Sequence, residues 1–369
     1  MNKHLAVIGV GIVGTGKHNE GIPAFVQALQ VLSKEYRITV YSFIPVNKQN
    51  VSSDIRVRCV PFANMPIRLC YMYLGVIFFL DHLRKRIDLV HAQSPFPAGV
   101  LAFYIRRIFN IPWLLSFHAT EAVYMPERNF GDLMNRSLAK KSIAIAQHAD
   151  AIMTMSKFQV DDIRKNLAVT KSIQVLPRGI EVPALESKRL RLPLQFIHIS
   201  YYQPVKDHAT LLKTIARVNR HVDFELKIIG DNYGQEFENQ IRTLAPGVKI
   251  NVIGPLPHRQ IIDELKKADL LIHTSFYEGL PMVALEAMAH GVVVCGTHVG
   301  IMADLSGKGC VTAPVGDDER LADAIIGIAN APDKFSSCRT QAHQWVKAHD
   351  MNGYISELKK CYDNLIGRK

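Results

Sequence analysis

Short apolar runs alternate with longer segments in which apolar residues recur every three or four positions along the first 180 residues. The short runs predict buried strands, and the longer period predicts amphipathic helices. This alternation is typical of a parallel sheet covered by helices. The predicted strands are residues 5–10, 38–43, 89–91, 113–117, 151–155 and 172–175. The predicted helices are residues 23–33, 67–86, 98–109, 131–148 and 157–166.

The pattern stops at residues 181–193 (EVPALESKRLRLP), which are polar, basic and bracketed by prolines, as expected of an interdomain linker. A second alternating series follows. Its predicted strands are residues 194–199, 225–229, 248–253, 270–274 and 292–296. Its predicted helices are residues 208–219, 235–244, 260–267, 281–290, 320–329 and 333–347, and the last amphipathic segment is 354–366. The sequence therefore predicts two doubly wound α/β domains, residues 1–180 and 194–348, each able to bind a ligand at the carboxyl ends of its strands.

Composition narrows the class of protein. The chain has 369 residues, 48% hydrophobic and 21% charged, which suits a folded protein of about two domains and excludes a disordered chain. Its six cysteines are scattered and form no C-x-x-C pair, so we expect reduced thiols, a cytoplasmic location and no zinc site. No signal peptide is recognised at the first residues. The longest apolar run, 69–80, has 12 residues, whereas a membrane span needs about 20.

The net charge of +11 is concentrated in the first half of the chain. Up to Leu185 there are 22 basic and 12 acidic residues, whereas the remainder has 22 basic and 21 acidic. This asymmetry predicts an anionic partner for the first half, either phospholipid, a phosphorylated substrate or nucleic acid. The alternative is an unevenly charged but solvated surface. Nucleic acid rests on charge alone, and we do not expect it as a partner.

Two glycine-rich motifs near the start resemble nucleotide-binding signatures. Gly9, Gly11 and Gly14 fit G-x-G-x-x-G, but that motif needs a helix opening at its last glycine, and the glycines and proline of 14–23 oppose one. Residues 11–18 nearly fit the P-loop, but His18 replaces the hydroxyl residue that ligates Mg²⁺. Both the dehydrogenase and the ATPase interpretations are therefore disfavoured. A long glycine-rich loop that brings backbone close to a ligand remains.

The segment 275–291 (SFYEGLPMVALEAMAHG) carries the most specific chemistry. Pro281 is suited to the first turn of a helix, whose free N–H groups would form an anion site. The residues expected to contribute to it are Gly279, Leu280, Pro281, Met282 and Val283. Glu278 precedes this helix and Glu286 lies about one and a half turns inside it. A helix start with an acidic first turn would explain Glu278, but not an acid among alanines and methionines.

This segment closely resembles the E-x7-E motif of retaining family 4 glycosyltransferases, which have the GT-B fold. The resemblance extends along most of the chain in the same order. The matching stretches are residues 20–23 (EGIP), 88–91 (DLVH), 116–121 (SFHATE), 149–152 (ADAI), 176–181 (LPRGIE), 205–207 (VKD), 228–231 (IIGD) and 253–256 (IGPL). The E-G-x-P…L-E-A-M-A run is specific, whereas each of the others is weak alone.

The resemblance implies a role for each matching residue. Glu278 would hold hydroxyls of the donor sugar, Glu286 the ribose, and Lys206 the donor diphosphate. His118 would lie beside the donor sugar near the reacting centre, and Gly21 would let its loop approach the phosphate. An isolated histidine at a strand end is usually a core residue, and a lysine at a helix start is usually solvated. Both gain weight only from the surrounding motifs. The histidines that we expect to be structural are His91, His273, His290 and His298.

The resemblance also implies an architecture and a mechanism. Two Rossmann-like domains would face each other across a central cleft, residues 1–180 on the acceptor side and 194–348 on the nucleotide-sugar side, and residues 349–369 would cross back to the first. The implied reaction is metal-independent and needs no cofactor. It retains the anomeric configuration by front-face attack, with the departing phosphate accepting the acceptor's proton. Hexosyl or N-acetylhexosaminyl transfer for cell-surface polysaccharide or glycolipid synthesis is the expected activity.

The sequence departs from the family pattern at the phosphate site. Many relatives carry an arginine shortly before the diphosphate lysine, but residues 200–206 (SYYQPVK) contain none. Either Gln203 or Tyr201 contacts the phosphate neutrally, or another basic residue substitutes, for which Arg178 is our candidate. Charge-assisted hydrogen bonds are worth about 1.5–3 kcal/mol against about 1 for neutral ones, so a weaker donor site is expected. The departure supports one rival hypothesis, a non-catalytic GT-B protein that binds nucleotide sugar or acts as a scaffold.

The acceptor is not specified by any motif, and a lipid-linked sugar or a glycan is favoured. Residues 71–80 and the basic 84–86 could form an interfacial helix with a positive end, on an anionic membrane. The alternative is a buried helix with a solvated end. Peripheral attachment to the inner face of the cell membrane is therefore a hypothesis of the sequence.

Overall fold

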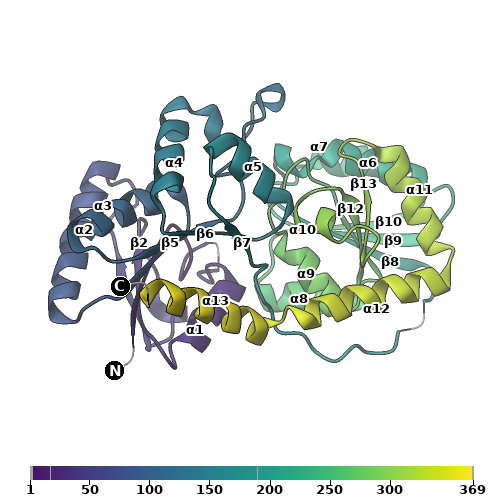
Figure 1. The fold of residues 1–369 in the computed structure, drawn as a ribbon. Coiled ribbons are helices and arrows are strands. Elements are labelled where there is room, and N and C mark those ends of the chain that lie inside the picture. Colours follow the sequence, from purple (N-terminus) through teal and green to yellow (C-terminus); the bar gives the residue numbers. More distant parts are fainter. Residues whose placement is uncertain (1–2, 17, 189, 368–369) are drawn as a thin grey trace. The chain divides into compact units, whose positions relative to one another are not determined.

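The computed structural model describes residues 3–16, 18–188 and 190–367. The chain forms two compact units, Met1–Gly179 with Met351–Lys369, and Ile180–Asp350. The first unit therefore contains both ends of the chain, and the second is one uninterrupted stretch (Figure 1). Residues 181–193 have no regular secondary structure at the positions that are described.

The first unit is built on a parallel sheet of seven strands in the order β3-β2-β1-β4-β5-β6-β7. The strands are β1 (His4–Gly9), β2 (Arg37–Ser42), β3 (Ile55–Cys59), β4 (Leu89–Ala92), β5 (Trp113–Phe117), β6 (Ala151–Thr154) and β7 (Ile173–Val175). Its helices are α1 (Pro23–Leu32), α2 (Ile67–Arg84), α3 (Val100–Phe109), α4 (Arg136–His148), α5 (Phe158–Leu167) and α13 (Met351–Ile366). The order reverses between β1 and β4, which is where open α/β sheets bind ligands.

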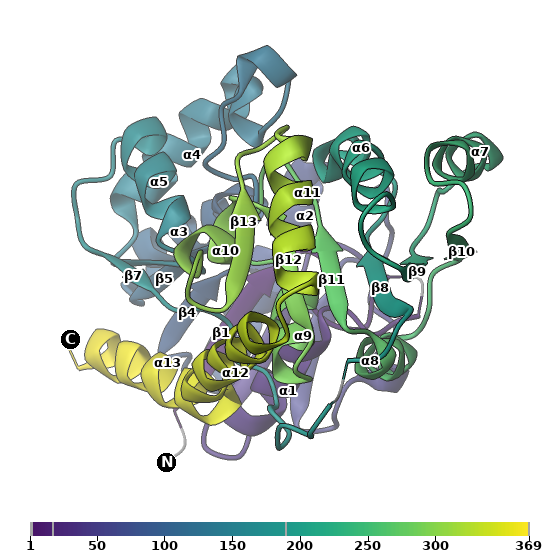
Figure 2. The ribbon, with the colours of Figure 1, turned by 90° about the vertical axis from the view of Figure 1, so that its right-hand side faces the viewer.

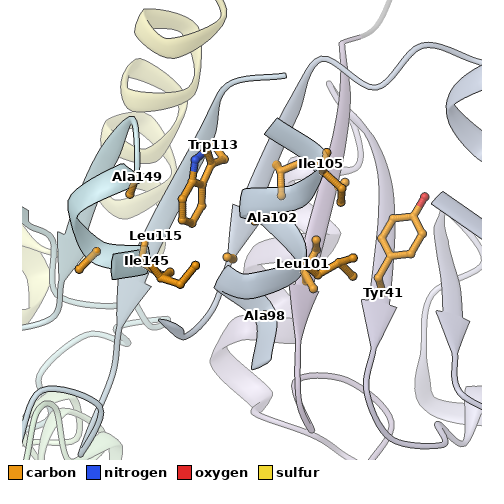
Figure 3. Close-up of a cluster of buried hydrophobic side chains, with 14 of the residues drawn as sticks. Tyr41, Ala98, Leu101, Ala102, Ile105, Trp113, Leu115, Ile145 and Ala149 are labelled. Carbon is orange, nitrogen blue, oxygen red and sulfur yellow. The ribbon is translucent and has the colours of Figure 1, made fainter. Parts of the chain in front are cut away.

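Strand residues alternate between two apolar cores because successive side chains point to opposite faces of a sheet. Ala6 and Ile8 pack with α2, α3 and α4, whereas Leu5 and Val7 pack with α1 and α13. Figure 3 shows part of the first core, with Trp113 of β5 lying between the strands and helices. In the second core, the hydroxyl of Tyr362 in α13 lies 2.7 Å from Nδ1 of His91 in β4. The last helix is thus part of the first unit's interior.

One buried ion pair ties the edge of this sheet to α2. Asp81 is 2% exposed, and its carboxylate accepts hydrogen bonds from Arg58 Nε at 2.9 Å and Nη2 at 2.7 Å. The hydroxyl of Tyr41 also donates to it, at 3.3 Å. Burial raises the pKa of Asp81, but the hydrogen bonds and charge of Arg58 outweigh this and lower it.

We expect Asp81→Asn to lower the free energy of unfolding by about 3 kcal/mol, because it leaves the Arg58 guanidinium without a counter-charge and a buried network partly unpaired. Chemical denaturation followed by circular dichroism measures this loss. Asp54→Asn, in an exposed loop of the same unit, is the matched control and should change stability by less than about 0.5 kcal/mol. Equal losses of stability in the two variants would show that the Asp81–Arg58 ion pair does not stabilise the first unit.

The second unit contains a parallel sheet of six strands in the order β10-β9-β8-β11-β12-β13 (Figure 2). The strands are β8 (Leu194–Ile199), β9 (Phe224–Ile229), β10 (Lys249–Ile253), β11 (Leu270–His273), β12 (Val293–Thr297) and β13 (Cys310–Ala313). The helices are α6 (His208–Val218), α7 (Gln235–Leu244), α8 (His258–Lys267), α9 (Met282–Ala289), α10 (Gly300–Asp304), α11 (Asp318–Ala329) and α12 (Pro332–Ala348). β8 and β11 are neighbours at the point where the strand order reverses.

Candidate active site

The loop that follows β11 carries Glu278 and is fixed by hydrogen bonds to the end of β12, to α10 and to the turn before α6. The Ser275 N–H donates to Thr297 Oγ1 at 2.8 Å, and the Phe276 N–H donates to the Val205 carbonyl at 2.9 Å. The Gly279 carbonyl accepts from the Ile301 N–H at 3.2 Å. These bonds hold the loop at the carboxyl edge of the sheet before α9 begins.

Glu278 has one oxygen that is fully occupied and one that is available. Oε1 accepts hydrogen bonds from Lys206 Nζ at 2.5 Å, Ser275 Oγ at 2.8 Å and His273 Nε2 at 3.2 Å. Oε2 receives no hydrogen bond from the residues that the structure describes, although the side chain is only 14% exposed. The carboxylate is therefore held rigidly while one of its oxygens can accept from a ligand hydroxyl.

The charge state of Glu278 follows from these contacts. Burial raises the pKa of a carboxyl group, but the hydrogen bond from His273 and the positive charge of Lys206 outweigh burial and lower the pKa of Glu278 to about 2. Glu278 is thus an anion at neutral pH, suited to accept hydrogen bonds and unsuited to donate a proton.

Lys206 comes from the loop after β8, the strand next to β11. It ends a 3-10 turn, Pro204–Lys206, directly before the N-cap Asp207 of α6, and so lies just before the helix at whose start the sequence placed it. The Lys206 carbonyl accepts from Thr274 Oγ1 at 3.0 Å, which ties this loop to the Glu278 loop. Neighbouring strands with tied loops explain why two residues 72 positions apart meet.

A cavity of about 270 Å³ opens beside this ion pair. The ends of three strands and the start of α9 line it, with Ser200, Tyr201, Lys206, Gly230, Met282 and Val283 among its walls. Met282 and Val283 are the first two helical residues, so their N–H groups lack helical partners and point out of the helix start. Pro281 is the N-cap and not the first helical residue, a one-position correction to the expected helix start.

The remaining predicted residues of this unit surround the same edge of the sheet. Leu280 is half-buried and Gly279 is buried in the loop before α9. Gln203 is exposed, and its carbonyl accepts from the Lys206 N–H at 2.9 Å. Tyr201 lines the cavity, whereas Gln203 is not among its walls. Contact of Gln203 with a phosphate stays a prediction.

Glu286 lies on α9 and is partnered by a histidine that the sequence analysis did not single out. His258 Nε2, at the first residue of α8, donates to Glu286 Oε1 at 2.8 Å. The Glu286 side chain is 12% exposed. A nearly buried carboxylate on an apolar helix therefore has a hydrogen-bond donor and a fixed orientation.

His273 corrects an expectation, because the sequence analysis treated it as structural. It is buried, it lines the cavity, and it is one of the three hydrogen-bond donors to Glu278. Its other ring nitrogen, Nδ1, has no hydrogen-bond partner among the described residues. His91, treated in the same way, is indeed a core residue bonded to Tyr362 and Ser116.

In the first unit, His118 lies at the end of β5 in a hydrogen-bonded row with Gln93 and Arg178. Its Nε2 is 3.1 Å from Gln93 Oε1, and its Nδ1 is 3.4 Å from Arg178 Nη2. A guanidinium can only donate, so Nδ1 must accept and Nε2 must carry the proton that Gln93 Oε1 receives. Burial, and then the charges of Arg178 and His91, lower the pKa of His118 well below its usual value. His118 is therefore neutral.

A second cavity, of about 250 Å³, opens beside this row. Gln93, His118, Glu121, Asp132 and Arg178 are among its walls. With Oε1 turned to His118, the Gln93 amide nitrogen is left without a hydrogen-bond partner among the described residues, although it is buried. An unsatisfied buried N–H group in a cavity wall is suited to donate to a ligand oxygen.

Glu121 positions His118. Its carboxylate accepts from the N–H groups of His118 at 3.2 Å and Ala119 at 2.6 Å, which caps the end of β5. Burial raises the pKa of Glu121 to about 7 against the opposing effect of these backbone hydrogen bonds.

Arg178 is engaged within the first unit. Its guanidinium lies 4.7 Å above the centre of the Phe25 ring in α1 and is 5% exposed. Burial lowers its pKa. Its contacts are thus with His118 and Phe25, and substitution for the missing phosphate arginine stays a prediction.

The glycine-rich loop after β1 has no helix at its described residues, 10–16 and 18–22, so neither the dinucleotide nor the P-loop motif shows its required helix there. Gly21 has a positive φ of 66°, and a Cβ there would lie 2.7 Å from the Ile12 carbonyl oxygen. The loop's own packing therefore requires glycine at this position. Approach of the loop to a phosphate stays a prediction.

Among the described residues, no group of three or more histidine, cysteine or acidic side chains is arranged to hold a metal ion. Metal-independent chemistry stays a prediction from the sequence.

Comparison with known proteins agrees with this geometry. The family model "Glycosyltransferase Family 4" matches residues 26–182, and "Glycosyl transferases group 1" matches residues 188–345. A D-inositol 3-phosphate glycosyltransferase of Corynebacterium jeikeium is 24% identical over 86% of this chain and 83% of its own. The putative teichuronic acid biosynthesis glycosyltransferase TuaC of Bacillus subtilis is 27% identical over 60% of this chain and 56% of its own.

A crystal structure of Anabaena HepE superposes with a TM-score of 0.76 at 16% identity, covering 98% of this chain and 100% of that one, a likeness that establishes the fold alone. The chain belongs to the family 4 glycosyltransferases, and its two units are the Rossmann-like halves of the GT-B fold. The predicted family and fold class are confirmed.

Proposed function

We propose that this glycosyltransferase moves a hexosyl or N-acetylhexosaminyl group from a nucleotide-diphosphate sugar to a hydroxyl group, with retention of configuration and without a metal. The observation that carries the proposal is the Lys206–Glu278 pair beside a cavity at the start of α9. It provides an ammonium group and free backbone N–H groups for a diphosphate, next to a carboxylate oxygen for sugar hydroxyls. The HepE structure was obtained with UDP-glucose, which supports a nucleotide-sugar donor.

The proposed reaction uses these groups as follows. The bond between the anomeric carbon and the phosphate oxygen breaks, and negative charge develops on the diphosphate near Lys206 and the Met282 and Val283 N–H groups. Glu278 Oε2 accepts from a hydroxyl of the sugar while Oε1 stays bonded to its three donors. The acceptor oxygen bonds to the anomeric carbon on the face that the diphosphate leaves, and its proton passes to the departing phosphate oxygen. No side chain forms a covalent intermediate.

In the first unit we assign His118 and Gln93 to binding of the sugar or the acceptor. A neutral His118 can donate or accept without bringing charge to the reacting carbon, and the unpartnered Gln93 amide offers a hydrogen bond to a ligand oxygen. The name of TuaC supports an acceptor in cell-surface polysaccharide synthesis, and we favour a glycan or a lipid-linked sugar. All six cysteines are free thiols, which supports a cytoplasmic location.

The second candidate is a non-catalytic protein that binds nucleotide sugar or acts as a scaffold, favoured only by the missing arginine before Lys206. The two proposals are separated by incubating the protein with a panel of nucleotide sugars and measuring release of free nucleoside diphosphate. Release above the buffer rate supports the transferase, including slow release to water. A donor that raises the melting temperature but is never consumed, with any acceptor tried, would support the binding protein.

We expect Glu286→Gln to weaken binding of the nucleotide by about tenfold, because a charge-assisted hydrogen bond to a ribose hydroxyl becomes a neutral one. Isothermal titration with the nucleoside diphosphate measures the change. Glu264→Gln is the matched control, since Glu264 is a carboxylate of α8 in the same unit that pairs with Lys227 and matches no motif. Neither Glu264 nor Glu286 is itself among the cavity walls. Unchanged affinity in Glu286→Gln would remove Glu286 from the nucleotide site.

A further inference from the structure

Helix α2 is apolar on two opposite sides, and only one of them is covered. Cys70, Leu74 and Phe78 recur every four residues and are buried against the sheet. The opposite side is formed by Leu69, Met72, Val76, Leu80 and Leu83, which recur every three or four residues and are exposed. We call these five residues the outer face of α2. The buried-helix alternative from the sequence therefore holds for one side only, and the interfacial alternative stays a prediction.

The outer face is unusual for a surface helix. Such a helix normally shows polar residues opposite its buried stripe, and a helix that is apolar all round is normally buried all round. Met72 is 67% exposed and Leu83 65% exposed, at positions about three turns apart. A contiguous apolar stripe of this length marks a surface that a partner covers.

The apolar surface continues onto α3, which packs beside α2. The ring of Phe79 in α2 stacks on Phe109 in α3 with centroids 6.0 Å apart. Next to Phe109, Ile108 is 71% exposed, and Tyr104 one turn earlier is also exposed. The surface therefore spans two adjacent helices.

The exposed charged residues of α2 and α3 are all basic. Arg68 lies near the start of α2, Arg84 and Lys85 at its end, and Arg107 on α3, and all four are exposed. None of them has an acidic partner among the described residues. The only carboxylate between residues 55 and 87 is Asp81, which is buried and paired with Arg58. The outer face is thus bordered by free cations and by no exposed carboxylate within that range.

Apolar residues bordered by cations fit one kind of partner, the interface of an anionic lipid bilayer. An interfacial helix lies along the surface, with its apolar side about 5–10 Å into the boundary between headgroups and acyl chains. The 18 residues of α2 span roughly 27 Å, which is long enough to lie flat on a membrane. No described helix has both the length and the apolar content to cross a bilayer.

We infer that the outer face of α2, with Ile108 of α3, docks this enzyme onto an anionic membrane surface. Leu69, Met72, Val76, Leu80 and Leu83 enter the interface, while Arg68, Arg84, Lys85 and Arg107 meet lipid phosphates. The inference deepens the proposed function, because it favours an acceptor that is itself held in a membrane. Lipid binding is measured without any substrate, so its failure would not affect the transferase proposal.

The test is flotation of the full-length protein with vesicles of phosphatidylcholine alone or with 30% phosphatidylglycerol. We expect the unsubstituted protein to bind the anionic vesicles, and to bind them more weakly at high salt. Arg84→Ala and Lys85→Ala should each weaken this binding on the order of fivefold. The double variant Met72→Asp with Val76→Asp should lose at least tenfold in binding. The matched control is Leu244→Asp, an exposed apolar residue of α7 in the second unit.

A fluorescence measurement tests whether α2 contacts the acyl chains. In Val76→Trp, brominated acyl chains should quench fluorescence that they do not quench in the unsubstituted protein. Its two tryptophans are Trp113, which is buried, and Trp345, which is half-buried on α12 of the second unit. Three results would overturn the inference. They are no binding to anionic vesicles, equal binding by the Met72/Val76 double variant when it melts at the temperature of the unsubstituted protein, or a lipid-free dimer in sedimentation velocity that this double variant dissociates. The last result would assign the outer face to a second copy of the chain.

Discussion

Lys206→Ala is expected to lower kcat for glycosyl transfer by about 10²- to 10³-fold, the range found when one preorganised group that stabilises developing charge is removed. The departing diphosphate would lose its ammonium partner and keep only the N–H groups at the start of α9. Glu278 would also lose its counter-charge, since Lys206 Nζ lies 2.5 Å from its Oε1. Initial rates with saturating donor measure the effect on kcat.

Lys227→Ala is the control for this variant. Lys227 forms an ion pair with Glu264 in the same unit but is not among the cavity walls, so it tests the loss of such a pair alone. We expect its kcat to stay within about twofold of the unsubstituted enzyme. A Lys206→Ala enzyme that is equally active would contradict the assignment of Lys206 to the leaving group.

Glu278→Gln is expected to lower kcat/KM by about 10²-fold and the free energy of unfolding by about 3 kcal/mol. The amide NH₂ that replaces Oε2 cannot accept from a sugar hydroxyl, and Lys206 loses its counter-charge inside a nearly buried site. Kinetics and urea denaturation measure the two effects. Glu264→Gln, which alters the Lys227 pair instead, should leave kcat/KM unchanged.

The same substitution should change how stability depends on pH. The pKa of Glu278 is about 2 in the folded protein against an ordinary value of 4.5, so its ionised form stabilises the fold above pH 4.5. This contribution, about 3 kcal/mol, is lost as the pH falls from about 4.5 towards 2. Glu278→Gln should therefore flatten the pH dependence of stability in that window. An unaltered acid-unfolding curve would show that Glu278 is not held as an ionised partner of Lys206.

Most strands and helices followed from the period of apolar residues, and the exceptions have physical reasons. β3 was missed because its sequence, IRVRC, alternates apolar residues with arginines at a sheet edge, where Arg58 is held by a buried aspartate. β13 has only four residues and α10 only five, so neither is long enough to show a periodic pattern of apolar residues. The helix expected over 131–148 begins at Arg136, because the Asn135 side chain accepts from the Ser137 and Leu138 N–H groups as an N-cap.

The residues of the candidate site that belong to sequence motifs were predicted. Glu278, Lys206, Glu286 and the start of α9 were marked by spacing and resemblance, and the structure brings Glu278 and Lys206 into contact. The residues that hold them were not predicted. His273 was taken as structural, and His258 carried no motif. Their partners are fixed by tertiary contacts, which bring the loop after β11 over His273 and α9 beside α8. A histidine at the end of the strand that precedes the E-G-L-P segment was the available signal for His273.

The membership of α13 in the first unit has a consequence for synthesis. Tyr354, Leu358 and Tyr362 belong to the same apolar core as Leu5 and Val7, so that core cannot close until α13 has left the ribosome. Ile180–Asp350, by contrast, is a single uninterrupted stretch that is translated before α13 begins. The second unit should therefore fold before the first unit is complete. Premature termination before Met351 should leave a folded second unit attached to an incomplete first unit.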